Sequence, residues 1–202
     1  MLKPSVAALF VCTLGCTPTI SDIFHEPHHH FVYKSPNVIA WDVHVPPRTS
    51  TLMHEHTYDY LYVTLGPATI TSQAYKGLTT HLDLHDGEIR YTKGPLTHVA
   101  SNDGASMFHN VTIELEHPAT NVVHCDSPCV YTSDQWTAYA MTLGPGQQVD
   151  TKNPFIVAVS DINLTHGREQ PLRGGPGTVG DTHNPLTNAG PTDARFVMLE
   201  FK

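Results

Sequence analysis

The sequence predicts an all-β protein, and three observations lead to this prediction. Runs rich in Val, Ile, Thr and Tyr recur along the chain, as is typical of strands. The 202 residues include 16 Pro and 14 Gly, which favour tight turns between short strands. No stretch shows sustained helical periodicity. A chain of this length can bury one large core, or two small cores that share a sheet.

The N-terminus has the features of an export signal. Lys3 precedes an apolar run over 5–14, which has the length of a signal peptide and is too short to span a bilayer. Residues 13–16 are similar to a bacterial lipoprotein cleavage box in which Cys16 would carry a lipid anchor, although Thr13 and Leu14 depart from that pattern. Ordinary cleavage nearby is the alternative. We therefore expect a signal peptide over 1–16 and an exported protein that is periplasmic, lipid-anchored or secreted.

A linker is expected over 17–36. It contains Phe24-His25-Glu26-Pro27-His28-His29-His30, a histidine-rich tract that could gather metal ions. Exposed polar surface is the alternative interpretation of this tract.

The next residues form a regular series of predicted strands. In the first of them, Ile39, Trp41, Val43 and Val45 share one face, and Pro46-Pro47 ends the strand. The Asp86-Gly87 pair is a strong hairpin signal. Further strands are predicted over 59–66, 68–74, 79–84, 88–91 and 108–115.

Two histidines precede the strand over 59–66. In an extended segment residues i and i+2 share a face, so His54 and His56 can point together while Glu55 points away. Histidine is the commonest protein ligand of metal ions, and His98 follows the Gly94-Pro95 turn that would bring the next strand alongside. We therefore predict that the three imidazoles converge on one ion. An exposed polar pair at a strand end is the alternative for His54 and His56.

The second half of the chain repeats the first in weaker form. Asn102-x-Gly104 is followed after nine residues by Glu114, and Asn188-x-Gly190 is followed after nine residues by Glu200. This repeat indicates two similar β modules, over 37–117 and 118–202.

Only the first module contains the histidine pair. Pro47 precedes Tyr60 by thirteen positions, and the corresponding Pro145 precedes Phe155 by ten. The missing residues fall where the pair would lie, so the second module is expected to be a degenerate copy without a metal.

Cys125 and Cys129 are expected to form a disulfide. Their short spacing suits a small closed loop in an oxidising compartment. A two-cysteine metal site is the alternative, but no cysteine or histidine pair with matching spacing accompanies them.

The charge argues against a nucleic-acid partner. The formal net charge is −8, and the 11 Lys and Arg residues are scattered. Phosphate binding requires clustered positive side chains.

The histidine motifs resemble those of the cupin superfamily, whose small β-barrels place three histidines and one glutamate around a metal. The first family motif is G, five residues, H-x-H, three or four residues, E, six residues, G. The second is G, five residues, P-x-G, two residues, H, three residues, N. This chain has His54-x-His56, Asp59 and Gly66 in the first motif, and Gly87, Lys93-Gly94-Pro95, His98 and Asn102 in the second.

The chain departs from the family pattern at several positions. Arg48 replaces the first Gly, and Lys93 and Pro95 displace the P-x-G triplet, which are changes of turn residues. Asp59 is shorter than the family's Glu and one residue nearer to His56. The resemblance therefore implies His54, His56 and His98 as ligands, with Asp59 either a fourth ligand or hydrogen-bonded to one of the rings.

The resemblance implies an all-β cupin-type double-stranded β-helix, or jelly-roll barrel, in each of the two modules. It also implies a divalent transition metal, for which Fe, Mn, Zn, Ni and Cu are all suitable. Three functions follow as alternatives: a metal-dependent enzyme of the dioxygenase, isomerase or lyase type that acts on a small molecule, a non-catalytic barrel that binds a small ligand, and a storage protein. The sequence leaves open whether the chain forms a homo-oligomer.

Overall fold

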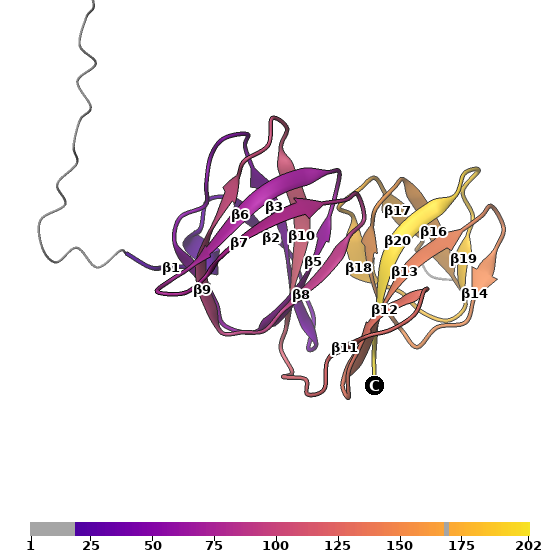
Figure 1. The fold of residues 1–202 in the computed structure, drawn as a ribbon. Helices are drawn as coiled ribbons and strands as arrows, with labels where there is room; N and C mark the ends of the chain where they lie inside the picture. The colour runs from indigo at the N-terminus through magenta and orange to yellow at the C-terminus, as the bar shows by residue number, and fades with distance from the viewer. Residues whose placement is uncertain (1–18, 168–169) are drawn as a thin grey trace, which may run out of the picture.

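The computed structural model describes residues 19–167 and 170–202, which form two β modules side by side (Figure 1). The predicted signal peptide, with Cys12 and Cys16, lies outside the described residues. Within those ranges, no helix has the length and apolar character needed to cross a bilayer.

The first module consists of two facing sheets. One sheet contains, in spatial order, β1 (Ser21–Asp22), β4 (His54–His56), β9 (Leu96–Asn102), β6 (Ala68–Ala74) and β7 (Thr79–Leu84). The other contains β2 (His29–Lys34), β3 (Val38–Val45), β10 (Phe108–Leu115), β5 (Asp59–Thr64) and β8 (Ile89–Thr92). A short 3-10 helix, η1 (Ile23–His25), joins β1 to the segment before β2.

The second module repeats this arrangement. Its inner sheet contains β11 (Val123–His124), β12 (Cys129–Thr132), β13 (Trp136–Leu143), β20 (Ala194–Phe201), β15 (Phe155–Ala158) and β18 (Val179–Asp181). Its outer sheet contains β14 (Gln148–Val149), β19 (Leu186–Asn188), β16 (Ile162–His166) and β17 (Leu172–Gly174). The all-β jelly-roll fold predicted from the sequence is confirmed.

The two Asn-x-Gly turns have the same hydrogen bonds in both modules. Asn102 Nδ2 donates to Val45 O at 2.9 Å and to Ser106 O at 2.8 Å, and Gly104 N donates to Asn102 Oδ1 at 2.9 Å. In the second module, Asn188 Nδ2 donates to Leu143 O at 2.7 Å and to Thr192 O at 2.8 Å, and Gly190 N donates to Asn188 Oδ1 at 2.9 Å. The internal repeat in the sequence therefore corresponds to the same turn structure in both modules.

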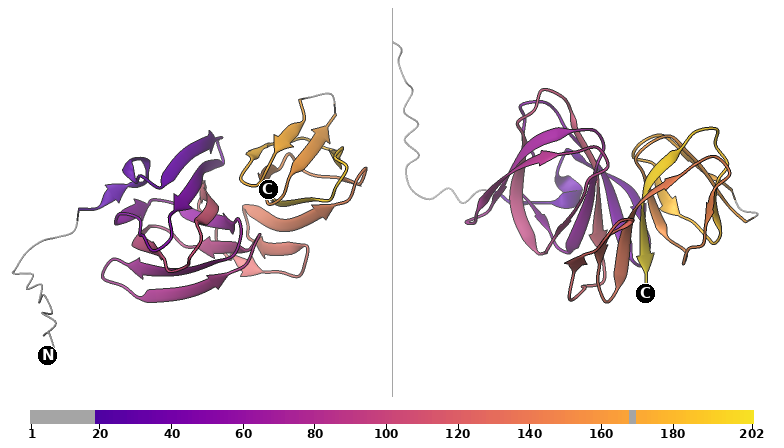
Figure 2. Two further views of the ribbon diagram at one scale, coloured as in Figure 1. Left: turned by 90° about the horizontal axis from the view of Figure 1, so that it is seen from above. Right: turned by 45° about the vertical axis from the view of Figure 1, so that its right-hand side comes forward.

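The sheet with β3 and β10 in the first module packs against the sheet with β13 and β20 in the second, and these are the inner sheets of the side-by-side barrels in Figure 2. On β3, Val38 and Ala40 point into this contact, while Ile39, Trp41, Val43 and Val45 point into the barrel. Both faces of the strand are therefore buried, which explains its nearly continuous apolar sequence. The same alternation places Val197 and Leu199 of β20 in the contact.

The expectation of a linker over 17–36 is wrong for most of that segment. β1 pairs in parallel with β4, and β2 pairs antiparallel with β3, so residues 21–34 belong to the first module. These pairings cover strand edges that would otherwise expose unpaired backbone groups. This segment has no period-2 pattern because five of the six residues of β2 are exposed or half-buried.

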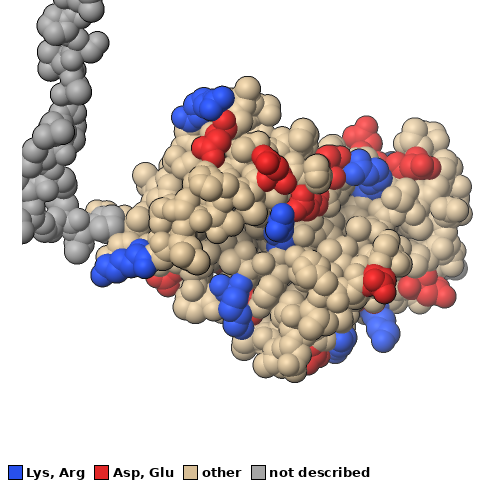
Figure 3. Space-filling view, viewed as in Figure 1, with Lys and Arg blue, Asp and Glu red and all other residues tan. Residues whose placement is uncertain are grey.

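Cys125 and Cys129 form a disulfide with Cα atoms 5.5 Å apart, as predicted. On the face shown in Figure 3, Lys and Arg side chains are dispersed among Asp and Glu side chains and do not gather into a patch.

Candidate metal centre

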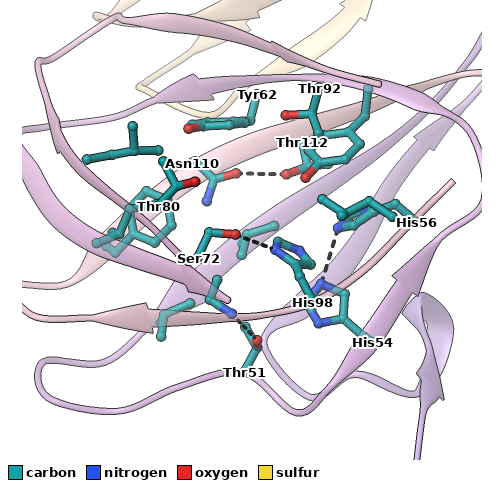
Figure 4. A pocket seen from close by; sticks show the side chains of 18 of the residues that line it. Thr51, His54, His56, Tyr62, Ser72, Thr80, Thr92, His98, Asn110 and Thr112 are labelled. Carbon is teal, nitrogen blue, oxygen red and sulfur yellow. Dashed lines mark hydrogen bonds between the residues drawn. The ribbon is translucent and has the colours of Figure 1, made fainter. Parts of the chain in front are cut away.

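Four imidazoles meet inside the first barrel. His54 and His56 project from β4, His98 projects from β9 directly opposite His54, and His29 projects from the start of β2. The Nε2 atoms of His54 and His56 are 3.1 Å apart, and the ring centroids of His29 and His98 each lie 4.7 Å from that of His54. Figure 4 shows His54, His56 and His98 together at one side of the cavity. The ring centroids of these three histidines lie 4.7 to 5.4 Å from one another, and their binding of one ion stays a prediction.

Each of the four rings is held through its Nδ1 atom. His54 Nδ1 donates to Leu52 O at 2.9 Å, and His98 Nδ1 is 2.9 Å from the hydroxyl of Ser72. His29 Nδ1 donates to the Glu26 carboxylate at 2.6 Å, and His56 Nδ1 is 3.2 Å from a carboxyl oxygen of Glu114. An imidazole that donates through Nδ1 has a bare lone pair on Nε2, which is the state required of a metal ligand.

Burial keeps the imidazoles of His54, His56 and His98 neutral. Removal from water lowers the pKa of His54 to about 4 and that of His98 to about 3. It also lowers the pKa of His56 well below the ordinary histidine value. Because each of these pKa values lies far below 7, the three rings are neutral at neutral pH, and each has one nitrogen with a free lone pair that can bind a metal.

Two buried carboxylates flank the histidines. Glu26 is 1% exposed and also accepts hydrogen bonds from the backbone N–H groups of His28 and Leu52, at 2.8 and 3.0 Å. Burial alone would raise the pKa of Glu26, but these bonds and that from His29 lower it to about 2. Burial raises the pKa of Glu114 to about 7. Glu26 is therefore charged at neutral pH, and Glu114 would be fully charged if a cation lay nearby.

This donor set fits a divalent transition metal. Ligand atoms of His29, His54 and His56 all lie within 4.8 Å of one another. His98 Nε2 is buried, and none of the described groups forms a hydrogen bond with it. Bare nitrogen lone pairs that face one another repel unless a cation lies between them. Two carboxylates on the outer side of the rings balance the charge of a dication, in the arrangement common around bound metals.

The structure does not bring Asp59 to the histidines. Its carboxylate accepts hydrogen bonds from Tyr91 Oη, Lys93 Nζ and Gly94 N, at 2.7, 2.8 and 2.9 Å. The reason is strand parity, because Tyr60 faces the cavity and its neighbour Asp59 must point to the other side of β5. The prediction that Asp59 is a fourth ligand, or is bonded to a histidine ring, is corrected: the residue that lies beside His54 and His56 is His29.

Asp59→Asn is expected to reduce the free energy of unfolding by about 1–3 kcal/mol at pH 7 and to leave the metal content unchanged. Burial favours the neutral carboxyl, but hydrogen bonds from Lys93, Tyr91 and Gly94 hold its pKa below the ordinary value of 3.8. A lowered folded-state pKa stabilises the protein above about pH 4, and this stabilisation disappears as the pH falls further. The difference in the free energy of unfolding between Asp59→Asn and wild-type protein should therefore become smaller as the pH falls below about 4. Denaturant unfolding at several pH values and metal analysis check this, and loss of metal would restore Asp59 as a ligand.

The histidines form one wall of a cavity of about 270 Å³. The rest of the lining is apolar or neutral, with hydroxyl and amide groups opposite the histidines (Figure 4). Leu78 lines the cavity and is 86% exposed, which places it at the mouth. The neutral polar residues of the lining are Thr51, Tyr60, Tyr62, Ser72, Thr80, Thr92, Asn110 and Thr112.

Sequence reasoning missed three residues of this centre. Glu26 and His29 are three positions apart in the histidine-rich tract, a spacing that could have indicated a bonded pair. Glu114 was used only as a marker of the repeat. Its position between Ile113 and Leu115, which face the other module, indicates that it faces the barrel.

The second module lacks an equivalent centre among its described residues. Asn184 takes the place of His98 relative to the Asn-x-Gly turn, and its Oδ1 accepts a hydrogen bond from Thr151 N at 2.9 Å. An amide and a threonine thus occupy the region that holds imidazoles in the first module.

No protein-family model and no curated protein sequence matches this chain. Several solved structures are similar in fold. AerE from Microcystis aeruginosa has a TM-score of 0.59 and 11% identity, over 88% of this chain and 98% of that one. A cupin 2 conserved barrel domain protein from Leptotrichia buccalis has a TM-score of 0.57 and 10% identity, over 86% and 88%. The oxalate decarboxylase of Lactobacillus farciminis, in a formate complex, has a TM-score of 0.58 and 10% identity, over 83% and 77%.

Proposed function

Starting from the cupin fold of this chain, we propose that it is a metal-dependent enzyme that acts on a small molecule in the barrel of the first module. His29, His54, His56 and His98 would hold one divalent ion of Fe, Mn, Zn, Ni or Cu. The observation that carries the proposal is the meeting of four buried imidazoles whose Nδ1 atoms are all engaged on the outside. The reaction is of a type that cupin enzymes perform, such as oxygenation, isomerisation or lyase chemistry.

A bound ion of this kind acts as a Lewis acid toward substrate oxygen atoms or activates dioxygen. The residues of the chain perform the other tasks. Apolar side chains such as Val45, Leu82 and Phe108 exclude water, and the hydroxyl groups of Thr92 and Thr112 can orient substrate oxygen atoms. The cavity volume limits the substrate to a small molecule.

The lining also favours a substrate with little charge of its own. Apart from the histidines, the described lining residues include no Asp, Glu, Lys or Arg. A charged group on the substrate would therefore find its counter-charge only at the metal, because an uncompensated buried charge is strongly unfavourable.

A second candidate function is a non-catalytic barrel that binds a small ligand, and one observation favours it. The other titratable groups of the lining are the phenols of Tyr60 and Tyr62. Burial raises the pKa of Tyr60 to about 12 and raises that of Tyr62 further. Neither group is suited to accept a proton near pH 7. Catalysis therefore depends on the metal, and a protein without metal could only bind.

Turnover by the metal-loaded protein separates these functions. Wild-type protein would be loaded separately with Fe(II), Mn(II), Zn(II), Ni(II) or Cu(II). Each form would be incubated with small phenols, hydroxy acids and keto acids, and the products identified by mass spectrometry with oxygen uptake recorded. We expect conversion by wild-type protein and none by His54→Ala or by the metal-free chain. Ligand binding without conversion in every metal form would support the binding barrel and contradict the enzyme.

We further propose that the protein is exported. The Cys125–Cys129 disulfide supports this, because disulfides persist mainly in oxidising compartments. Labelling of free thiols in protein from each cell fraction tests it. Recovery of the chain only from the cytoplasm, with both thiols free, would contradict the proposal.

A further inference from the structure

A second cluster of metal-ligating side chains lies outside the barrel, on the face of the β2-β3-β10-β5-β8 sheet that is turned toward the second module. Asp42 and His44 alternate on β3, and His109 lies on β10 directly opposite His44. These residues have the strand parity of Ala40 and Val111, which face the second module. The three side chains are 28%, 37% and 23% exposed. An ion from solvent can therefore reach them without entering the barrel.

The three ligand groups already have short separations. Asp42 Oδ1 is 2.7 Å from His109 Nε2, and Asp42 Oδ2 is 3.0 Å from His44 Nε2. The two imidazoles are stacked with centroids 4.1 Å apart, and the ligand atoms of all three residues lie within 4.8 Å of one another. In a tetrahedral site with bonds of about 2.0–2.2 Å, neighbouring ligand atoms are about 3.3 Å apart. Small side-chain adjustments would therefore place the three groups in one coordination sphere.

The surroundings of the cluster suit a cation. The Asp42 carboxylate supplies negative charge beside two imidazoles and is hydrogen-bonded to both. A further imidazole, that of His30, has its centroid 6.0 Å from that of His44. A Cβ atom added to Gly177 would lie 3.5 Å from His109 Nε2, so a loop of the second module lies beside the cluster.

We propose that Asp42, His44 and His109 bind a second divalent transition metal ion at the junction of the modules. Two imidazoles and one carboxylate suit Zn²⁺ or Cu²⁺, with water in the remaining position. Each ring would bind through Nε2 with its proton moved to Nδ1. The ion would tie β3 to β10, so it would stabilise the folded chain. This site is independent of the ion held by the barrel.

Zn²⁺ stoichiometry tests the second site. Untagged protein would be stripped with a chelator and dialysed against buffered Zn²⁺, and bound zinc would be counted per chain. Wild-type protein is expected to bind two equivalents, and Asp42→Asn/His109→Gln protein is expected to bind one. His54→Ala/His98→Ala protein should also bind one equivalent, held by the junction site. The exposed-residue control His85→Gln/His124→Gln should still bind two.

The comparison of wild type with Asp42→Asn/His109→Gln is decisive even if the barrel variant does not fold. Equal zinc binding by these two proteins would show that the cluster holds no ion and would overturn the inference. A wild-type chain that binds a single equivalent, lost on Asp42→Asn/His109→Gln, would support the junction site while contradicting the metal proposed for the barrel. The measurement can therefore contradict the junction site without contradicting the barrel site, and the reverse.

Discussion

His98→Ala protein is expected to lose its barrel metal on dialysis and to lose the stabilisation that this metal provides. A ligand that binds only the folded state at 100 to 1,000 times its Kd contributes about 3–4 kcal/mol. The variant should therefore unfold at lower denaturant concentration than wild type when the ion is present. With the ion removed from both proteins the difference should shrink to the cost of losing the buried ring and its hydrogen bond with the Ser72 hydroxyl. Unfolding curves with and without metal measure both effects.

The matched control for this variant is His183→Ala. His183 is an exposed histidine of the second module, and it lies outside both histidine clusters. Its replacement should change neither barrel metal nor stability. Retention of the barrel ion by His98→Ala protein would mean that the ion is held without this residue, and the four-histidine centre would be wrong.

Glu26→Ala is expected to weaken metal binding about 10–100-fold, the usual effect of removing a partner that orients a metal ligand. It should also destabilise the metal-free protein by about 3–5 kcal/mol. The carboxylate is buried and accepts from His29 Nδ1, His28 N and Leu52 N, and all three donors would lose their partner. The same side chain therefore fixes both the N-terminal segment and the ring of His29.

Glu55→Ala provides the control for this prediction. Glu55 lies between His54 and His56 on β4 but is exposed and points away from the barrel. Its replacement should change the free energy of unfolding by less than about 0.5 kcal/mol, as is usual for surface substitutions. If Glu26→Ala behaves like Glu55→Ala in both metal affinity and stability, the proposed role of the N-terminal segment is wrong.

Local alternation explains what could be predicted from the sequence. His54 and His56 share a face because they are two residues apart in a strand, and this holds without knowledge of the rest of the fold. His98 was predicted to join them because the turn at Gly94-Pro95 reverses the chain, and His98 does lie opposite His54 in register. The Asn-x-Gly repeat predicted the two modules because each Asn closes the same local turn.

Contacts between distant segments explain what could not be predicted. His29 reaches the centre because β1 pairs with β4 and β2 pairs with β3, and no local pattern in 17–36 signals these pairings. The family motif places Asp59 at the position of the family's Glu, whereas its direction is set by strand parity, which turns it away from the cavity that its neighbour Tyr60 lines.

The position of the ion in crystals of metal-loaded wild-type protein tests the central claim most directly. Diffraction recorded at the absorption edge of the metal would locate the ion without any substitution in the chain. The predicted result is an anomalous peak about 2.0–2.2 Å from Nε2 of His29, His54, His56 and His98. Absence of a peak among these four nitrogens in fully loaded crystals, or a peak coordinated by Asp59 in place of His29, would contradict the account.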